Sequence, residues 1–149
     1  MDVIEFNEII DFAVAREQEA VSFYHDLAGK VKFAAHKEML AEYEAMEMGH
    51  IVMLENIRKN GINSGEIKKV QNLRISEYLS TEAQDLDFSY PSLLIRAMKR
   101  EEASLKLYTE LGRRFEDPEL QKLFARLAAE EAGHKLRFET LYDEWMVNN

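Results

Sequence analysis

The chain has 149 residues, of which 46% are hydrophobic and 32% charged, a size and composition typical of one soluble domain with its own core. It has no cysteine, which excludes disulfides, thiolate zinc sites, iron–sulfur clusters and a rubredoxin-type iron site. The net charge of −9 without a basic cluster argues against nucleic-acid binding, and the lack of a targeting segment or a long apolar run predicts a cytoplasmic protein without a membrane span.

The first half of the chain has the periodicity of two helices. Over residues 5–28 apolar residues recur at spacings of three, four or seven, which places them on one helix face together with Glu17. A second apolar line runs over about 35–60, and it includes Glu47 and His50. We therefore predict a helix pair in this half.

Residues 61–88 have no sustained period, although a short helix over 73–79 is compatible with the sequence. This connector is long for neighbouring antiparallel helices, and it suits a crossover along the length of a helical bundle. Gly29 and Gly61 stand at the expected ends of the first two helices, where a residue that tolerates positive φ is favoured.

The second half repeats the helical pattern. A third helix is expected to start near Pro91, and its apolar line includes Glu101. Asp117 and the proline that follows it predict a capped start for a fourth helix, whose line includes Glu131 and His134. We therefore predict a second helix pair in this half.

One offset of 84 residues relates the two halves. It carries Glu17, Tyr24, Glu47, Gly49 and His50 onto Glu101, Tyr108, Glu131, Gly133 and His134. Each half thus offers one Glu from its first helix and a Glu-x-x-His from its second, the ligand set of a two-metal centre in a four-helix bundle. The sequence predicts one all-α domain over 1–149, with helix pairs at 5–60 and 89–146 and a connector at 61–88.

Carboxylates within apolar helix faces imply a metal. A buried carboxylate must neutralise, pair or bind a cation, and two divalent ions would balance the four Glu. The i, i+3 spacing lets Glu47 and His50 reach the same ion. Because a mid-helix Gly costs about 1 kcal/mol relative to Ala, the recurrence of Gly49 and Gly133 predicts that a side chain there would block close approach of a helix or ligand. The alternative is a set of polar residues that fixes bundle register, which needs one polar contact rather than six.

The motifs Glu17 with Ala20 and Tyr24, Glu47-Met-Gly-His50, Glu101 with Tyr108, and Glu131-Ala-Gly-His134 resemble those of the ferritin-like di-iron carboxylate proteins. The resemblance is greatest to the rubrerythrins. It implies a ferritin-like four-helix bundle with two Fe ions, although the donors also suit Mn or Zn. The implied ligand roles are terminal for Glu17 and His50 on one iron and Glu101 and His134 on the other, and bridging for Glu47 and Glu131.

The resemblance implies a peroxidase that reduces hydrogen peroxide or O2. Two departures from the family stand out: the chain has no rubredoxin domain, so electrons must come from an external donor protein, rubredoxin-like or other, and Ser104 stands where many rubrerythrins have an extra Glu. Ferritin-like oxidation of Fe(II) and hydroxylation of an organic substrate are alternatives. A metal-free helical module that recruits partners is the non-catalytic alternative.

Other residues carry weaker signals. Tyr24 and Tyr108 lie two turns from Glu17 and Glu101, so they either hydrogen-bond to the ligand carboxylates or simply pack in the core. Glu44, His25 and His36 are expected at the surface or, for Glu44, beside the ligands. The apolar residues expected at the surface, which predict a homodimer, are Phe12, Phe33, Phe88 and Trp145.

Overall fold

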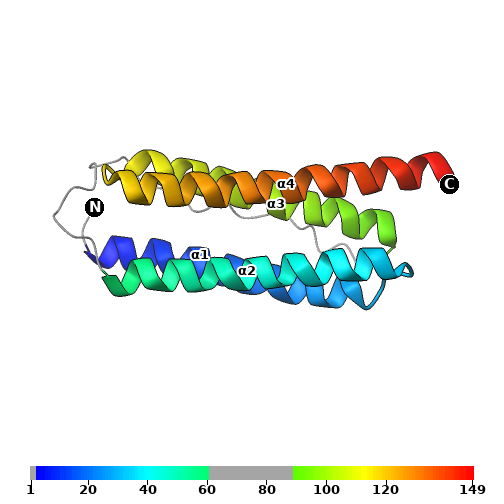
Figure 1. The fold of residues 1–149 in the computed structure, drawn as a ribbon, viewed down its shortest axis with the longest axis horizontal. Helices are drawn as coiled ribbons and strands as arrows, with labels where there is room; N and C mark the ends of the chain where they lie inside the picture. Colours follow the sequence, from blue (N-terminus) through cyan, green and yellow to red (C-terminus); the bar gives the residue numbers. More distant parts are fainter. Residues whose placement is uncertain (1–2, 61–88) are drawn as a thin grey trace. The chain divides into compact units, whose positions relative to one another are not determined.

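The computed structural model describes residues 3–60 and 89–149, which contain four α-helices and no strand (Figure 1). The helices are α1 (Val3–Ala28), α2 (Ala34–Asn60), α3 (Tyr90–Arg114) and α4 (Pro118–Asn148). The predicted all-α fold with two helix pairs is confirmed. The predicted crossover, with its short helix and Gly61, lies outside the described residues.

The helices form two compact units, one containing α1 and α2 and the other containing α3 and α4. Within each unit the two helices pack side by side and antiparallel, as Figure 1 shows. The connections within the pairs are short, residues 29–33 in the first unit and 115–117 in the second. They favour this pairing because a short connection places the next helix directly beside the one before it. The assignment of residues 1–149 to one domain stays a prediction.

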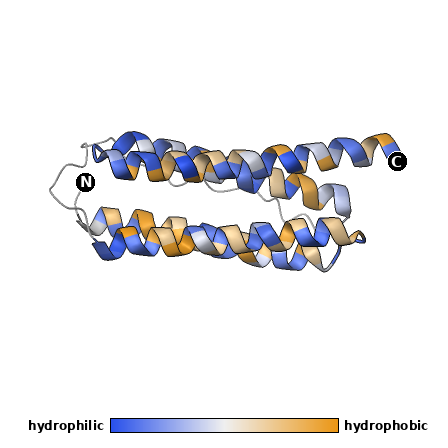
Figure 2. Cartoon of the chain, viewed as in Figure 1, coloured by the Kyte–Doolittle hydropathy of each residue, from blue (hydrophilic) through white to orange (hydrophobic). Residues whose placement is uncertain are grey.

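The predicted apolar lines form the core of the first unit. Phe6, Ile10 and Leu27 of α1 are buried, as are Leu40 and Leu54 of α2. Figure 2 shows the same amphipathic character along the helices, where hydrophobic and hydrophilic residues alternate around each ribbon. Burial of a side chain of this size contributes about 1.5–3 kcal/mol, so these lines account for much of the stability of the pair.

Helix α1 ends directly before Gly29, as the sequence predicts. The φ of Gly29 lies outside the left-handed region, so this helix end does not use the tolerance of positive φ that favours glycine there. The chain instead closes through consecutive turns, in which the backbone N–H of Gly29 donates to the Asp26 carbonyl at 3.1 Å and that of Lys30 to the Leu27 carbonyl at 2.9 Å. Val31, which follows these turns, is buried and anchors the connection to α2.

The helix starts in the second unit follow the predicted chemistry. Pro91 lies in the first turn of α3, where its missing N–H has no helical partner to lose. The side chain of Asp117 caps α4 by accepting a hydrogen bond from the backbone N–H of Glu119 at 2.9 Å. Inside the unit, Phe124 stacks on Phe115 with 5.3 Å between ring centroids.

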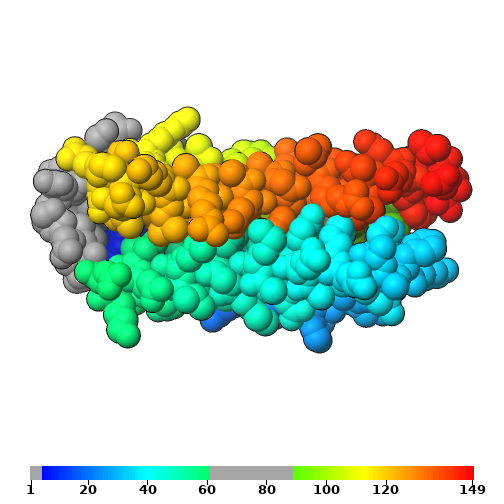
Figure 3. Space-filling view, viewed as in Figure 1, coloured from blue at the N-terminus to red at the C-terminus, as the bar shows by residue number. Residues whose placement is uncertain are grey.

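Within the described residues, the large apolar side chains that are exposed are those of Phe33, Met48, Val52, Ile95, Leu136, Met146 and Val147. Of those predicted to be exposed, Phe33 is exposed, Phe12 and Trp145 are half-buried, and Phe88 lies outside the described residues. The space-filling view in Figure 3 shows the side chains of α2 as a continuous surface along the whole helix. No helix in the described ranges is long and apolar enough to cross a membrane. The homodimer stays a prediction.

Candidate metal centre

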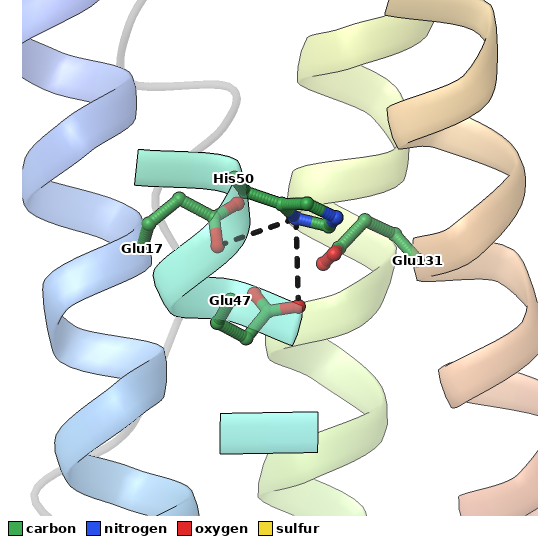
Figure 4. A group of neighbouring side chains, drawn as sticks. All are labelled: Glu17, Glu47, His50 and Glu131. Carbon is green, nitrogen blue, oxygen red and sulfur yellow. Dashed lines mark ion pairs between the residues drawn. The ribbon is translucent and has the colours of Figure 1, made fainter. Parts of the chain in front are cut away.

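The first unit brings three of the predicted ligands together, Glu17 from α1 and Glu47 and His50 from α2. All three are at most 1% exposed, and one ligand atom of each lies within 4.8 Å of the others. His50 Nδ1 is 3.6 Å from Glu17 Oε2 and 3.6 Å from Glu47 Oε1, the two contacts drawn as dashed lines in Figure 4. We call these three residues the first half-site.

The second unit repeats the arrangement with Glu101 from α3 and Glu131 and His134 from α4. Their exposed fractions are 1%, 1% and 3%, and one ligand atom of each again lies within 4.8 Å of the others. His134 Nδ1 is 3.5 Å from Glu101 Oε1. We call these residues the second half-site, and the sequence repeat is therefore also a repeat of side-chain geometry within each helix pair.

Each half-site has a donor set that fits one divalent cation. Its two carboxylates carry a formal charge of −2 when ionised, and its imidazole can add a neutral nitrogen ligand. The nitrogen–oxygen distances of 3.5 and 3.6 Å are longer than the roughly 2.7–3.2 Å of an N–H···O hydrogen bond. They are close to the spacing of about 3.4 Å between two ligands that are each about 2.1 Å from a tetrahedral ion. Oxygen and imidazole donors of this kind suit Fe, Mn and Zn.

The half-sites lie within apolar surroundings on their own helices. Ala13 and Ala20 flank Glu17 one turn away on either side, and both are buried. Ala97 precedes Glu101 by one turn in the same way, and it is fully buried. Glu17 and Glu101 are themselves only 1% exposed, so water solvates their carboxylates poorly, and a cation bound there would compensate their charge.

Both predicted tyrosines are buried in the cores of their units. Tyr24 lies edge-on to Phe23, with ring centroids 5.9 Å apart, and edge-on to Tyr43, with centroids 6.0 Å apart. Tyr108 instead stacks on Phe124, with centroids 6.2 Å apart. Core packing is thus established for both rings, while a hydrogen bond from either hydroxyl to a ligand carboxylate stays a prediction.

The two repeated glycines have no steric explanation within the described residues. A Cβ atom added at Gly49 or at Gly133 would meet no heavy atom of the described residues within 4 Å, apart from its chain neighbours and the nearby backbone of its own helix. The expectation that a side chain there blocks the approach of another helix therefore finds no support in either helix pair. The remaining part of that expectation, approach of a ligand, stays a prediction.

The residues with weaker sequence signals are all at least partly exposed. The His25 side chain is 74% exposed, which confirms its predicted surface position, and its Nδ1 is 3.4 Å from Glu44 Oε1. The Glu44 side chain is 21% exposed and belongs to neither half-site. His36 is half-buried and lies edge-on to Phe33 near the start of α2.

Sequence reasoning did not single out Tyr43. The residue belongs to the apolar line of α2, and its contact with Tyr24 arises only from the packing of two helices. A usable signal was present, since Tyr43 breaks the repeat: its equivalent in the second half is Leu127.

Comparison with known families gives a match in the second helix pair. Residues 92–149 match the rubrerythrin family model. The resemblance to the rubrerythrins is confirmed. The matched segment includes the whole second half-site, so the family similarity covers the residues that would bind metal in that unit as well as its helices.

Two solved structures share the fold. A hypothetical protein from Pyrococcus furiosus is 24% identical, with a TM-score of 0.72 over 93% of this chain and 88% of that protein. CopM, in its Cu(II)-bound form, is 12% identical, with a TM-score of 0.67 over 91% of this chain and 94% of CopM. These likenesses concern the fold, and they fit the predicted ferritin-like helical bundle. Comparison with curated proteins gives no match.

Proposed function

We propose that this protein is a non-haem di-iron oxidoreductase that reduces hydrogen peroxide or O2 with electrons from an external donor. The observation that carries the proposal is the occurrence of the same buried donor set, two Glu and one His, in both helix pairs. The rubrerythrin match supports it, because it covers the second of these donor sets. Redox chemistry favours iron over Zn among the metals that these donors suit.

The two half-sites together would hold two ions. Glu17 and His50 would bind one iron, Glu101 and His134 the other, and Glu47 and Glu131 both. The charge balance supports this assignment, since each half-site contributes −2 and two Fe(II) ions contribute +4. A neutral assembly is what a buried site of this kind requires.

The bound iron pair would supply two electrons together, which is what the reduction of one peroxide to two waters consumes. The protein's own contribution is to hold and orient the ligands in dry surroundings. In each unit the imidazole Nδ1 lies beside a carboxylate oxygen of the neighbouring helix, so the packing of the helix pair brings both groups together before a metal arrives. Preorganised ligands lose little conformational entropy on binding, which favours a tightly held centre.

An external electron donor completes the proposal. The 149 residues contain no cysteine, so they offer no rubredoxin-type iron that could return electrons to the site. A rubredoxin-like protein or another one-electron carrier would take that part. We also propose that the protein acts as a homodimer, which sedimentation at micromolar concentration would test.

Iron content is the direct test. The protein loaded with Fe(II) without oxygen should bind two irons per chain, and Glu131→Ala should lose this occupancy because the substitution removes a shared ligand. Glu130→Ala is the matched control, since Glu130 is the adjacent residue on α4 and its side chain pairs with Arg126 at 3.1 Å instead. Separate additions of peroxide and O2 to the reduced protein would show which oxidant reacts faster. Two-iron occupancy and full peroxide turnover in Glu131→Ala would contradict the proposal.

Copper binding is a second candidate, favoured by the fold shared with CopM in its Cu(II)-bound form. Nitrogen and oxygen donors generally bind Cu(II) more strongly than Fe(II), so affinity alone would not select iron. Elemental analysis after purification without added metal discriminates the two. Copper in place of iron, without peroxide reduction by the reduced protein, would favour copper handling over the oxidoreductase.

A further inference from the structure

One face of α2 and one face of α4 carry the same pattern of small and apolar side chains. The 84-residue offset relates the two sets, which are Ala41, Ala45, Met48, Gly49 and Val52 on α2 and Ala125, Ala129, Ala132, Gly133 and Leu136 on α4. Their spacing of about three to four residues keeps each set on a single helix face. Every member is exposed or half-buried, and Val52 and Leu136 are 60% and 63% exposed. We call the two sets the α2 stripe and the α4 stripe.

Each stripe lies on the side of its helix away from the half-site. Ala45 and Val52 lie about 140–160° around α2 from the two ligands of that helix, since each residue adds about 100° of rotation. The repeat offset gives the same relation on α4. A helix that directs its ligands toward an ion therefore directs its stripe away from that ion, so metal binding leaves the stripe available to another molecule.

The glycines of the stripes call for a close neighbour. A mid-helix Gly costs about 1 kcal/mol relative to Ala, and the described residues leave open space beside both Gly49 and Gly133. Packing within a helix pair thus explains neither glycine. Two packed helices have axes about 8–10 Å apart, and the lower end of this range needs small side chains at the contact. The stripes, which consist largely of Ala and Gly, supply such side chains to a helix from outside the pair.

The borders of the two stripes have opposite charges. Glu38 and Glu42 border the α2 stripe, and the offset places Lys122 and Arg126 at the equivalent positions of α4. All four residues are exposed. Two α2 stripes or two α4 stripes in contact would bring like charges together, whereas an α2 stripe against an α4 stripe brings opposite charges together. The same chain therefore carries both halves of a complementary contact, which identifies a second copy as the partner.

We propose that a second copy of this chain covers the stripes, with the α2 stripe of one copy packed against the α4 stripe of the other. The inference deepens the homodimer proposed above and does not depend on the peroxide chemistry. A twofold axis generates the contact twice, which closes the assembly at two copies. The contact removes Met48, Val52 and Leu136 from water, and close approach of the two helices explains the glycines.

Two charge variants, studied by sedimentation equilibrium at micromolar concentration, test the contact. The basic variant, Glu38→Lys with Glu42→Lys, gives both stripes basic borders, and the acidic variant, Lys122→Glu with Arg126→Glu, gives both acidic borders. Each variant alone should dimerise at least about tenfold more weakly than the wild type, because like charges then meet across the contact. An equimolar mixture should form a heterodimer as strong as the wild-type dimer, because opposite borders meet again.

Net charge does not account for these expected results. The wild type has a net charge of −9, so the basic variant has less overall repulsion between copies and would associate more strongly without a specific contact. Lys99→Glu with Lys106→Glu is the matched control for the acidic variant. It makes the same change in net charge at two exposed residues of α3, and it should leave the dimer unchanged.

A glycine variant tests the close approach of the helices. Gly133→Leu adds an apolar side chain that by itself favours association, yet it should weaken the dimer at least about tenfold because the added side chain overpacks the contact. In dilute solution, where the chain is monomeric, the variant should be at least as stable as the wild type because Leu is a better helix former than Gly. An unchanged or stronger dimer in Gly133→Leu contradicts the close approach.

The outcomes separate this contact from the proposals beside it. Far-UV circular dichroism and iron content are measured first, and each helix has its own variants, so the misfolding of one variant leaves the others to decide. A monomeric wild type overturns the contact and the homodimer, while two irons per chain and peroxide turnover in that monomer would still support the oxidoreductase. A dimer that both charge variants retain, or a mixture that fails to dimerise, overturns the contact alone.

Hydroxyl-radical footprinting identifies what covers the stripes. Leu136 should be protected in the wild-type dimer and should react freely in the basic variant. Protection that persists in the monomeric variant would mean that another segment of the same chain covers the α4 stripe, and it would overturn the inference.

Discussion

Replacement of Glu47 by glutamine should have opposite effects on the stability of the metal-free and metal-loaded protein. Glu47 is fully buried, and one of its oxygens lies within 4.8 Å of a Glu17 oxygen. Two ionised carboxylates at that separation repel each other by about 3 kcal/mol at an effective dielectric constant of about 20. Proton uptake by the half-site relieves part of this repulsion, so we expect Glu47→Gln to raise the free energy of unfolding of the metal-free protein by about 1–2 kcal/mol.

The metal-loaded protein should respond in the other direction, because the amide is a poorer ligand than the carboxylate. A ligand present at about 100 times its dissociation constant stabilises the native state by about 2.7 kcal/mol. Glu47→Gln should lose most of this increment. The variant would therefore be the more stable protein in chelator and the less stable one in Fe(II).

Urea unfolding followed by far-UV circular dichroism, in chelator and in anaerobic Fe(II), measures both effects. Glu44→Gln is the matched control, since it makes the same change one turn earlier on α2 at a residue whose partner is His25. The control should be affected equally in the two conditions. The reasoning is refuted if Glu47→Gln destabilises the metal-free protein, or if Fe(II) stabilises Glu47→Gln as much as the wild type.

Gly133→Ala should raise the free energy of unfolding by up to about 1 kcal/mol, because helix propensity improves and no described atom obstructs the new methyl group; a loss of stability in urea unfolding would contradict this. Asp117→Ala should cost about 1 kcal/mol through loss of the α4 cap, measured in the same way, and an unchanged midpoint would argue against the cap. Lys135 Nζ lies 2.8 Å from Glu102 Oε2 and lowers the pKa of Glu102, and Lys135→Met removes this partner. Because both side chains are about one-third exposed, the loss in free energy of unfolding should stay below about 1 kcal/mol near neutral pH. Since the folded pKa of Glu102 is lowered, this cost should vanish as the pH falls through that pKa, and a pH-independent difference would show that the ion pair is not its origin.

Hydrophobic periodicity predicted the helices well because the apolar residues of a helix can be buried against a partner helix only if they lie on one face. The predicted 5–28 and 35–60 differ by two residues or fewer from α1 and α2. The same logic located the half-sites: a carboxylate such as Glu17 or Glu101 within an apolar line has a high cost unless something compensates its charge. Both side chains are 1% exposed, so the charged residues that interrupt the apolar lines were the most informative positions in the sequence.

Contacts that depend on the rotation of one helix against another were not predictable. The rings of Tyr24 and Tyr43 meet because of the relative rotation of α1 and α2, on which the sequence period has no bearing. Arg114 is a further case, since it is only 5% exposed although it is a basic residue in the last turn of α3. Its Nε lies 3.2 Å from Glu110 Oε1, and its aliphatic stem can cover apolar surface, a combination that residue type alone does not reveal.

The short connections within each helix pair bear on the order of events during folding. Residues 29–33 and 115–117 close each pair at a small loss of chain entropy, and the contacts they permit are local in sequence. Each pair can therefore assemble quickly, whereas cation capture needs ligands from two helices that are already aligned. Iron should accordingly leave the refolding rate nearly unchanged and slow unfolding, which would make the metal a determinant of the lifetime of the native state.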